Sequence, residues 1–203
     1  MLTIDGATST SYAGIISGTG GLTRAGTGTI TLTGANTYSG GTTLKGGVVS
    51  VAADSALGAT TGGLTFNGGT LQITGTTYTS TSRAITWGAG GGTFDVSTAG
   101  NTFTVAQNLG AGGALTKIGA GTLVLSGTNQ YTGGTNINGG TLVAGSNGNL
   151  GATSGGLNLN GGTLRLSSAF DNARAVTLGA GGGTIETVTG SSIFQAPSVA
   201  RVR

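Results

Sequence analysis

The stretch that decides the fold is LNLNGGTLRL at residues 157–166, together with its near-copy LTFNGGTLQI at residues 64–73. Taken alone, each stretch predicts a β-hairpin, because Asn-Gly between alternating apolar residues is the strongest local signal for a tight turn between antiparallel strands. A glycine pair beside an asparagine is also found in ligand-binding loops. The spacing of the copies along the chain therefore has to decide between a turn, a binding site and one unit of a larger repeat.

Most of the chain is an internal repeat. Residues 22–73 align without gaps on residues 115–166, at an offset of 115 minus 22, or 93 residues, and half of the aligned positions are identical. Glycine pairs recur within this period at intervals of 21 to 27 residues, and most of them precede a strand-like run such as TLQI or TLRL. Units of this length are too short to bury their own apolar faces, so they must stack on one another.

Stacked units of this size predict an all-β fold, a single-stranded parallel β-helix (β-solenoid) of about nine coils of 21–27 residues. Coils would pair at the usual strand spacing of about 4.8 Å. Leu, Ile, Val and Phe at alternate positions would fill the lumen, and Thr, Asn and Ser would cover the outside. An antiparallel propeller or barrel is the alternative, but its repeats usually run to about 40 residues or more.

We expect one β-helix segment over residues 1–203, with repeat 1 at about 20–112, repeat 2 at about 113–196 and a frayed tail at 197–203. In this arrangement the Asn-Gly-Gly stretches are corners, where Gly and Asn tolerate positive φ at the lowest cost. The predicted corner residues are Asn67, Gly68, Gly69, Asn160, Gly161 and Gly162.

Composition restricts the function. Of the 203 residues 45 are Gly and 6% are charged, and there is neither Cys nor His. A disulfide framework, a thiolate metal site and a Ser-His triad are therefore excluded. The N-terminus MLTIDGATST lacks the features of a signal peptide, and no apolar run reaches the length of a membrane span. We expect no membrane span in this chain, and any export signal or anchor to lie outside it.

The basic pI of about 9.7 reflects a net charge of only +3. A phosphate-binding surface needs clustered cations, preferably with aromatic residues between them. Here Arg201 and Arg203 lie close together, and the other cations are scattered singly: Arg24, Lys45, Arg83, Lys117, Arg165 and Arg174. The sequence therefore predicts no nucleic-acid partner.

The acidic residues are Asp5, Asp54, Asp95, Asp171 and Glu186. Asp95 and Glu186 occupy equivalent places in the two repeats, so we expect them on one face, about four coils or roughly 19 Å apart. A glycosidase carboxylate pair is separated by about 5 to 9.5 Å. We therefore interpret the acids as single solvated charges, and predict no catalytic residue, no metal site and no cofactor.

Two blocks identify a family. GTGTITLTGANTYSGGTTLKGGVVSVA (26–52) and GAGTLVLSGTNQYTGGTNINGGTLVAG (119–145) resemble the autotransporter-associated β-strand repeat, or passenger-associated transport repeat, through the pattern GTLxLxGxNxYxGGT. This repeat occurs in passenger regions of Gram-negative autotransporters and in related surface proteins. The resemblance implies a right-handed β-helical stalk that a C-terminal β-barrel exports to the cell surface, and a repeat that assists passenger folding and transport. The last block, IFQAPSVARVR, departs from the pattern.

The sequence and the resemblance together predict a non-catalytic stalk segment of a secreted or cell-surface passenger, with adhesion or self-association along its Thr and Asn faces as an open question. One alternative is an adhesin for host or neighbouring-cell glycans, in which Tyr38, Tyr131, Asn36 and Asn129 contact sugar rings. Packing inside a coil is the other interpretation of these tyrosines. A polysaccharide-acting β-helix enzyme is the remaining alternative.

Overall fold

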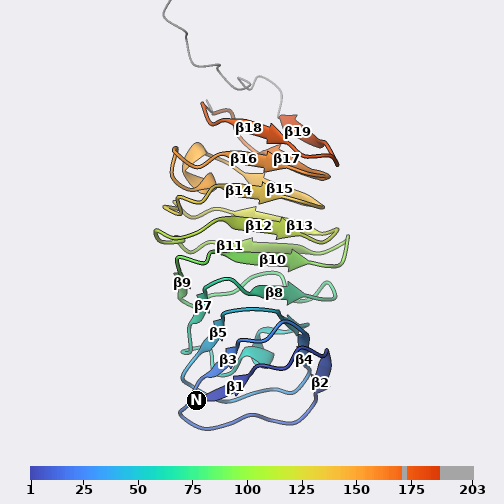
Figure 1. The fold of residues 1–203 in the computed structure, drawn as a ribbon, viewed down its shortest axis with the longest axis vertical. Helices are drawn as coiled ribbons and strands as arrows, with labels where there is room; N and C mark the ends of the chain where they lie inside the picture. Colours follow the sequence, from blue (N-terminus) through green and yellow to red (C-terminus); the bar gives the residue numbers. More distant parts are fainter. Residues whose placement is uncertain (171–172, 188–203) are drawn as a thin grey trace, which may run out of the picture.

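The computed structural model of the chain describes residues 1–170 and 173–187. Within them the chain winds into a rod of stacked coils, with the N-terminus at one end (Figure 1). Every strand pairing in these residues is parallel, and one sheet contains nine strands, one from each coil. The predicted β-solenoid of about nine coils is confirmed.

The strands form three parallel sheets, which are three faces of the rod. Sheet A contains β1 (Leu2–Ile4), β3 (Leu22–Arg24), β5 (Thr42–Leu44), β7 (Leu64–Phe66) and β9 (Ile85–Trp87). Sheet B contains β2 (Thr10–Tyr12), β4 (Thr29–Leu32), β6 (Val48–Val51), β8 (Thr70–Ile73), β10 (Gly92–Val96), β12 (Leu115–Ile118), β14 (Thr135–Ile137), β16 (Leu157–Leu159) and β18 (Val176–Leu178). Sheet C contains β11 (Thr102–Val105), β13 (Thr122–Leu125), β15 (Thr141–Ala144), β17 (Gly162–Leu166) and β19 (Gly183–Thr187). The described part of the chain also contains two short 3-10 helices, η1 (Asp54–Leu57) and η2 (Asn147–Leu150).

LNLNGGTLRL is divided between two faces. Leu159 of β16 pairs in parallel with Ile137 in sheet B, and Thr163 of β17 pairs in parallel with Thr141 in sheet C. The two halves of the stretch therefore pair with neighbouring coils and not with each other, which excludes the hairpin. Partners in sheet B are 19 to 23 residues apart, for example Ile30 with Val49 and Leu71 with Phe94. Coils are thus slightly shorter than the glycine pairs predict, because those pairs do not all mark the same corner.

Most coils consist of two strands and a return segment, by which we mean the stretch that leads from the second strand to the next coil. In repeat 1 the return segments lie on the side of sheet C, where Ser80 bridges to Thr104 of β11. From β12 onward the chain forms strands in sheets B and C, so the return segments lie on the side of sheet A. The change occurs in the coil of β9, β10 and β11, which has a strand on all three faces.

This change turns repeat 2 by one face relative to repeat 1. β3 in sheet A corresponds in sequence to β12 in sheet B, and β4 in sheet B corresponds to β13 in sheet C. The same shift holds for every later pair of equivalent strands. The offset of 93 residues is therefore four coils and one further face.

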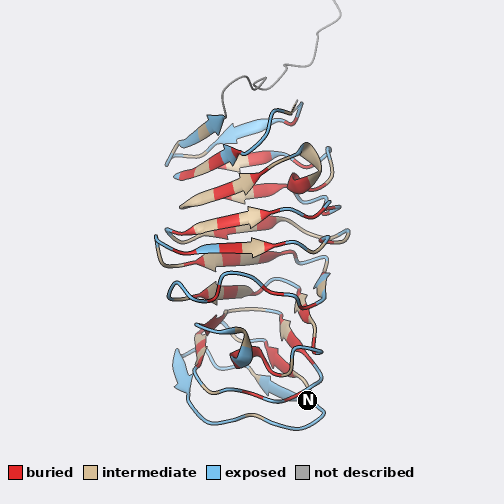
Figure 2. Ribbon diagram, turned by 180° about the vertical axis from the view of Figure 1, so that it is seen from behind, coloured by how far each residue is buried: buried red, intermediate tan, exposed pale blue. Residues whose placement is uncertain are grey.

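The buried apolar side chains form one continuous cluster along the rod. Buried and partly exposed residues alternate along most strands, as expected when every second side chain points into the lumen (Figure 2). Leu71, Phe94 and Leu159 stand in one ladder of sheet B. Phe66 stands in sheet A and Leu164 in sheet C, so the leucines of the opening stretch belong to two different ladders.

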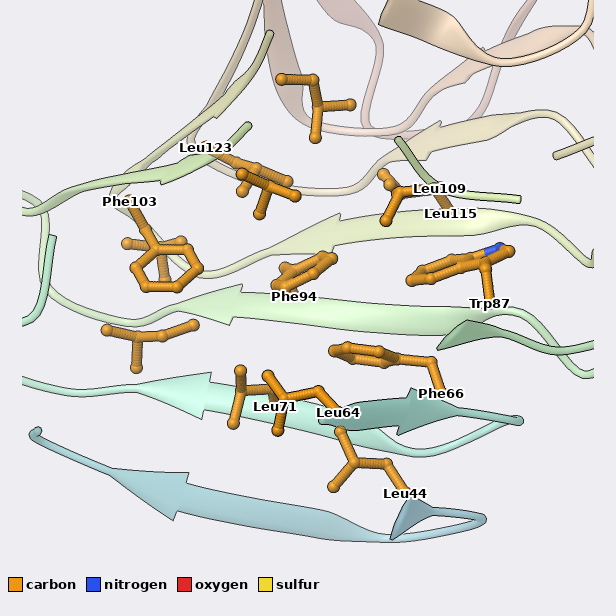
Figure 3. Packing of buried hydrophobic residues seen from close by; sticks show 14 of the residues in the cluster. Leu44, Leu64, Phe66, Leu71, Trp87, Phe94, Phe103, Leu109, Leu115 and Leu123 are labelled. Atoms are coloured by element: carbon orange, nitrogen blue, oxygen red, sulfur yellow. The ribbon is translucent and has the colours of Figure 1, made fainter. Parts of the chain in front are cut away.

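Aromatic rings fill the lumen around the coil where the return segment changes face (Figure 3). The ring centroids of Phe66 lie 5.1 Å from Trp87 and 4.8 Å from Phe94, and those of Phe94 and Phe103 are 6.3 Å apart. Trp87 also contacts the Tyr131 ring, at 6.1 Å, from the repeat 2 side. Since each aromatic side chain buries more apolar area than an aliphatic one, these rings fill the space between the two differently oriented repeats.

Candidate functional site

Asn36 connects three successive coils. Its Oδ1 accepts a hydrogen bond from the Ile16 N–H at 2.7 Å, in the coil before, and its Nδ2 donates to the Ala56 carbonyl at 2.6 Å, in the coil after. Asn129 makes the equivalent pair of bonds in repeat 2, at 2.8 and 2.5 Å. Both side chains are buried. These amides therefore pair backbone groups that neighbouring coils would otherwise leave unsatisfied.

Tyr38 and Tyr131 lie inside the solenoid, at 2% and 0% exposure. Their hydroxyls share hydrogen bonds with Thr42 at 2.6 Å and with Thr135 at 2.8 Å. Burial raises the pKa of both hydroxyls, and that of Tyr131 to about 12. Since neither ring presents a face to solvent, packing accounts for both, and the carbohydrate contact stays a prediction without support from the geometry.

Arg83 closes around a turn of the preceding coil. Its buried guanidinium forms a bidentate ion pair with Asp54, in which both nitrogen-to-oxygen distances are 2.9 Å. It also donates to the backbone carbonyls of Asp54, Gly58, Ala59 and Gly62, at 2.6 to 3.0 Å. All of its N–H groups are thus used. We call this arrangement the arginine clasp of repeat 1.

Repeat 2 contains the same clasp around Arg174. Its guanidinium donates to the carbonyls of Asn147, Gly151, Ala152 and Gly155, which are the sequence equivalents of the four carbonyls in repeat 1. Nε donates to the side-chain Oδ1 of Asn147 at 2.9 Å. An amide here takes the place of the carboxylate in repeat 1, so the clasp requires an acceptor at this position but not a charge.

Asp54 is part of this buried network. Burial alone would raise the pKa of its carboxyl, but hydrogen bonds from Arg83, from Tyr78 at 2.9 Å and from Thr81 at 3.2 Å, with the charge of Arg83, hold it below its usual value. The interpretation of Asp54 as a single solvated charge is therefore wrong. Its partner Arg83 lies 29 positions later, and no local pattern links the two residues.

Lys117 points into the lumen of repeat 2 and is fully buried. Its ammonium donates to the carbonyls of Ile118 at 2.6 Å, Gly119 at 2.9 Å and Gly139 at 3.2 Å. Burial lowers the pKa of Lys117 to about 8, although the negative charge of Asp95 opposes the shift. The ammonium thus supplies donors to corner carbonyls of two coils.

Arg24 occupies the equivalent lumen position in repeat 1. It donates to the carbonyls of Ile4 at 2.9 Å and Gly6 at 2.8 Å in the preceding coil, and to that of Gly28 at 3.2 Å in its own. Four of the cations that are scattered along the sequence therefore have one common role. Each is buried and supplies hydrogen bonds to backbone carbonyls at a corner or turn.

Comparison with known proteins agrees with this construction. Residues 22–51 and 115–144 match the passenger-associated-transport-repeat family. The two matched segments occupy equivalent places in repeat 1 and repeat 2. The resemblance predicted from the sequence is confirmed. No curated protein and no solved structure is significantly similar to the chain.

The transport repeat uses its characteristic polar residues internally. In the pattern GTLxLxGxNxYxGGT, the Asn bonds to two neighbouring coils, while the Tyr bonds to the Thr that follows the glycine pair. Sequence reasoning missed the arginine clasps and the lumen cations. The available signal was their occurrence at equivalent places in both repeats, Arg24 with Lys117 and Arg83 with Arg174.

Asp95 and Glu186 do not share a face. Asp95 lies in sheet B and Glu186 in sheet C, so the expectation of one common face is wrong, because repeat 2 is turned by one face. Asp95 accepts hydrogen bonds from Gln72 at 2.7 Å and Ser97 at 3.1 Å. Glu186 forms an exposed ion pair with Arg165 at 2.6 Å. Exposed pairs of this kind contribute little to stability.

Some predicted features lie outside the described residues, namely Asp171, Arg201, Arg203 and the tail 197–203. In residues 1–170 and 173–187, no three His, Cys, Asp or Glu side chains come together as metal ligands would. The same part of the chain has no helix of sufficient length and apolarity to span a membrane.

The Asn-Gly-Gly stretches connect strands on neighbouring faces. Residues 67–69 join β7 to β8, and 160–162 lead from β16 into β17. Asn67 and Asn160 each accept, through Oδ1, a hydrogen bond from a glycine N–H of the next coil, at 2.9 and 2.8 Å. The following glycines, Gly68 and Gly161, have φ angles of 109° and 97°, which residues with a side chain rarely adopt.

Breaking a clasp should destabilise the solenoid. We expect Arg83→Met to lower the free energy of unfolding by about 3 to 5 kcal/mol, because it removes the cation that is paired with Asp54 and the donor to the Gly58 and Gly62 carbonyls. Asp54→Asn, which copies Asn147 of repeat 2, should cost less. Urea titration checks both, with the exposed Arg165→Met as the control. Equal losses for Arg83→Met and Arg165→Met would contradict the clasp.

The buried Lys117 should give stability a particular pH dependence. Its pKa is about 8 in the folded chain and about 10.4 when unfolded, so between these values the unfolded state binds more protons. Raising the pH from 8 towards 10 should therefore increase the free energy of unfolding of the native chain more than that of Lys117→Met. The tyrosines titrate in the same way in both proteins, so the difference between them reports Lys117 alone. Urea titrations across this range measure the difference. A difference independent of pH would contradict the lowered pKa.

Proposed function

We propose that the chain is a non-catalytic stalk segment of a secreted or cell-surface passenger of the autotransporter type, which supports the folding and export of the passenger and its presentation at the surface. The observation that carries this proposal is the internal use of the repeat's polar residues. Asn36, Tyr38 and Arg83, with their counterparts in repeat 2, bond to neighbouring coils and leave no ligand-binding group free. Such residues serve the rod itself.

The acids support a structural role in preference to a polysaccharide-acting one. Asp54 is bonded to Arg83, and Asp95 and Glu186 lie on different faces of the rod. An acid and a base for glycoside hydrolysis must flank one bond at about 5 to 9.5 Å. The alternative of a glycan-binding adhesin lacks an exposed ring face at Tyr38 or Tyr131.

Threonine ladders on the outside favour a second candidate function, self-association of surface-displayed copies. One row in sheet A consists of Thr3, Thr23, Thr43, Thr65 and Thr86, of which Thr23 is buried beside Met1 and the others are exposed or partly exposed. One row in sheet C consists of Thr102, Thr122, Thr141, Thr163 and Thr184. A row of hydroxyls at the strand spacing of about 4.8 Å is matched rung by rung by another solenoid of the same repeat.

Export tests the stalk. The full chain is placed between an export signal and an outer-membrane translocator in a Gram-negative host, and surface protein is measured by accessibility to antibody and protease. We expect efficient display of the native chain and of the control Arg165→Met. The double variant Arg83→Met with Arg174→Met should be displayed less at an equal level of synthesis. Failure of the native chain to reach the surface would contradict the transport role. Release of new reducing or unsaturated ends from a polysaccharide panel by the purified chain would contradict the non-catalytic role.

Self-association has its own test. We expect Thr122→Lys with Thr141→Lys to weaken association of the purified chain in sedimentation, because it places like charges along the sheet C row. Thr43→Lys with Thr65→Lys is the matched change in sheet A and shows which ladder is used. Association that neither pair of substitutions alters would exclude both ladders as the interface.

A further inference from the structure

The chain contains four Asn-Gly bonds: Asn67–Gly68, Asn138–Gly139, Asn147–Gly148 and Asn160–Gly161. Such bonds are chemically labile, because glycine has no side chain to hinder attack of its own nitrogen on the preceding asparagine side chain. The attack requires a glycine N–H that is free of hydrogen bonds and an asparagine amide that is free to rotate. The coils satisfy these requirements unequally.

Two of the four bonds are held by the neighbouring coil. The Gly68 N–H donates to the Gly91 carbonyl at 2.8 Å, and Oδ1 of Asn67 accepts from the Gly90 N–H at 2.9 Å. Asn160 is held in the same way, with both equivalent distances at 2.8 Å. Neither the attacking nitrogen nor the amide that it would attack is therefore free.

A third bond is held by the clasp of repeat 2. Asn147 begins η2, and its Oδ1 accepts a hydrogen bond from Nε of Arg174 at 2.9 Å. The side chain cannot turn towards its own backbone without breaking this bond. The clasp thus protects Asn147 in addition to stabilising the turn.

Asn138 is different. It is exposed at the corner between β14 and β15, and within residues 1–170 and 173–187 neither its side chain nor the Gly139 N–H makes a hydrogen bond. The Lys117 ammonium lies 3.2 Å from the Gly139 carbonyl oxygen. A positive charge beside this bond favours the deprotonated form of the attacking nitrogen.

We propose that Asn138 is a self-modification site, which converts to aspartate and isoaspartate in the folded protein while the other three asparagines persist. The Gly139 nitrogen gives its proton to solvent and forms a bond to Cγ of Asn138. The bond from Cγ to Nδ2 breaks, and the nitrogen leaves as ammonia after taking a proton from water. Water then opens the cyclic imide at one of its two carbonyls, which gives aspartate or isoaspartate. No oxidant or reductant takes part.

The product changes the charge of one corner. Asn138 corresponds to Lys45 of repeat 1, so the equivalent corner there carries a positive charge. Conversion turns the neutral corner of repeat 2 negative, close to the buried Lys117. A carboxylate at this place favours the charged form of the lysine, and its pKa rises as the reaction proceeds.

The purified full chain is incubated at neutral pH, where the Lys117 ammonium is charged, and aspartate and isoaspartate at each of the four sites are quantified by peptide mass spectrometry over time. We expect Asn138 to convert at least about tenfold faster than Asn67 and Asn160, since their reaction requires two hydrogen bonds to open first. Comparable rates at these sites in the folded chain, or no conversion at Asn138, would overturn the proposal.

Two controls separate the fold from the local sequence. In the urea-unfolded chain all four asparagines should convert at similar rates, because the same Asn-Gly bond is then free everywhere. Asn138→Lys, which introduces the residue of repeat 1, should remove the fast site and leave the other three rates unchanged. A preference for Asn138 that persists in urea would assign the selectivity to sequence and overturn the structural explanation.

Discussion

A chain that winds into short coils must turn its backbone at every corner, where carbonyl groups lie away from water and have no strand partner. Each such group costs free energy unless a donor reaches it. The solenoid meets this constraint with cations and amides from neighbouring coils. Arg24, Arg83, Lys117 and Arg174 donate to corner and turn carbonyls, and Asn36 and Asn129 bond to the coils on both sides. Four of the eight cations of the chain therefore lie where the backbone needs donors.

This use of polar groups explains why the transport repeat has a recognisable sequence pattern although its outer surface carries mainly Thr, Asn and Ser. The ladders that fill the lumen accept several apolar residues, so packing there restricts the choice of amino acid only weakly. The Asn and Tyr of the pattern must each reach a particular backbone or hydroxyl group, which few other side chains can do. The clasp shows the same restriction outside the matched segments, because Arg174 contacts the four carbonyls equivalent to those of Arg83 although the acid of repeat 1 has become an amide.

The parallel solenoid could be predicted from sequence because spacing and alternation are local properties. Leu159 and Thr163 lie on different faces, as the repeat of LNLNGGTLRL requires. The buried network of Asp54 could not be predicted, since its partner lies a whole coil further along the chain and the contact exists only once the coils stack. The separation of Asp95 from Glu186 was also hidden, because an alignment fixes the offset between two residues but not the number of turns that the offset makes.

That fractional number of turns has a consequence for any longer rod built from this repeat. Each copy advances by four coils and a third of a revolution, so three copies complete thirteen coils before the same feature points in the same direction again. Identical corners thus follow a screw path around the axis. Successive copies in such a rod present the same residues on each of the three faces in turn. A partner that approaches from any side therefore meets an equivalent part of the sequence.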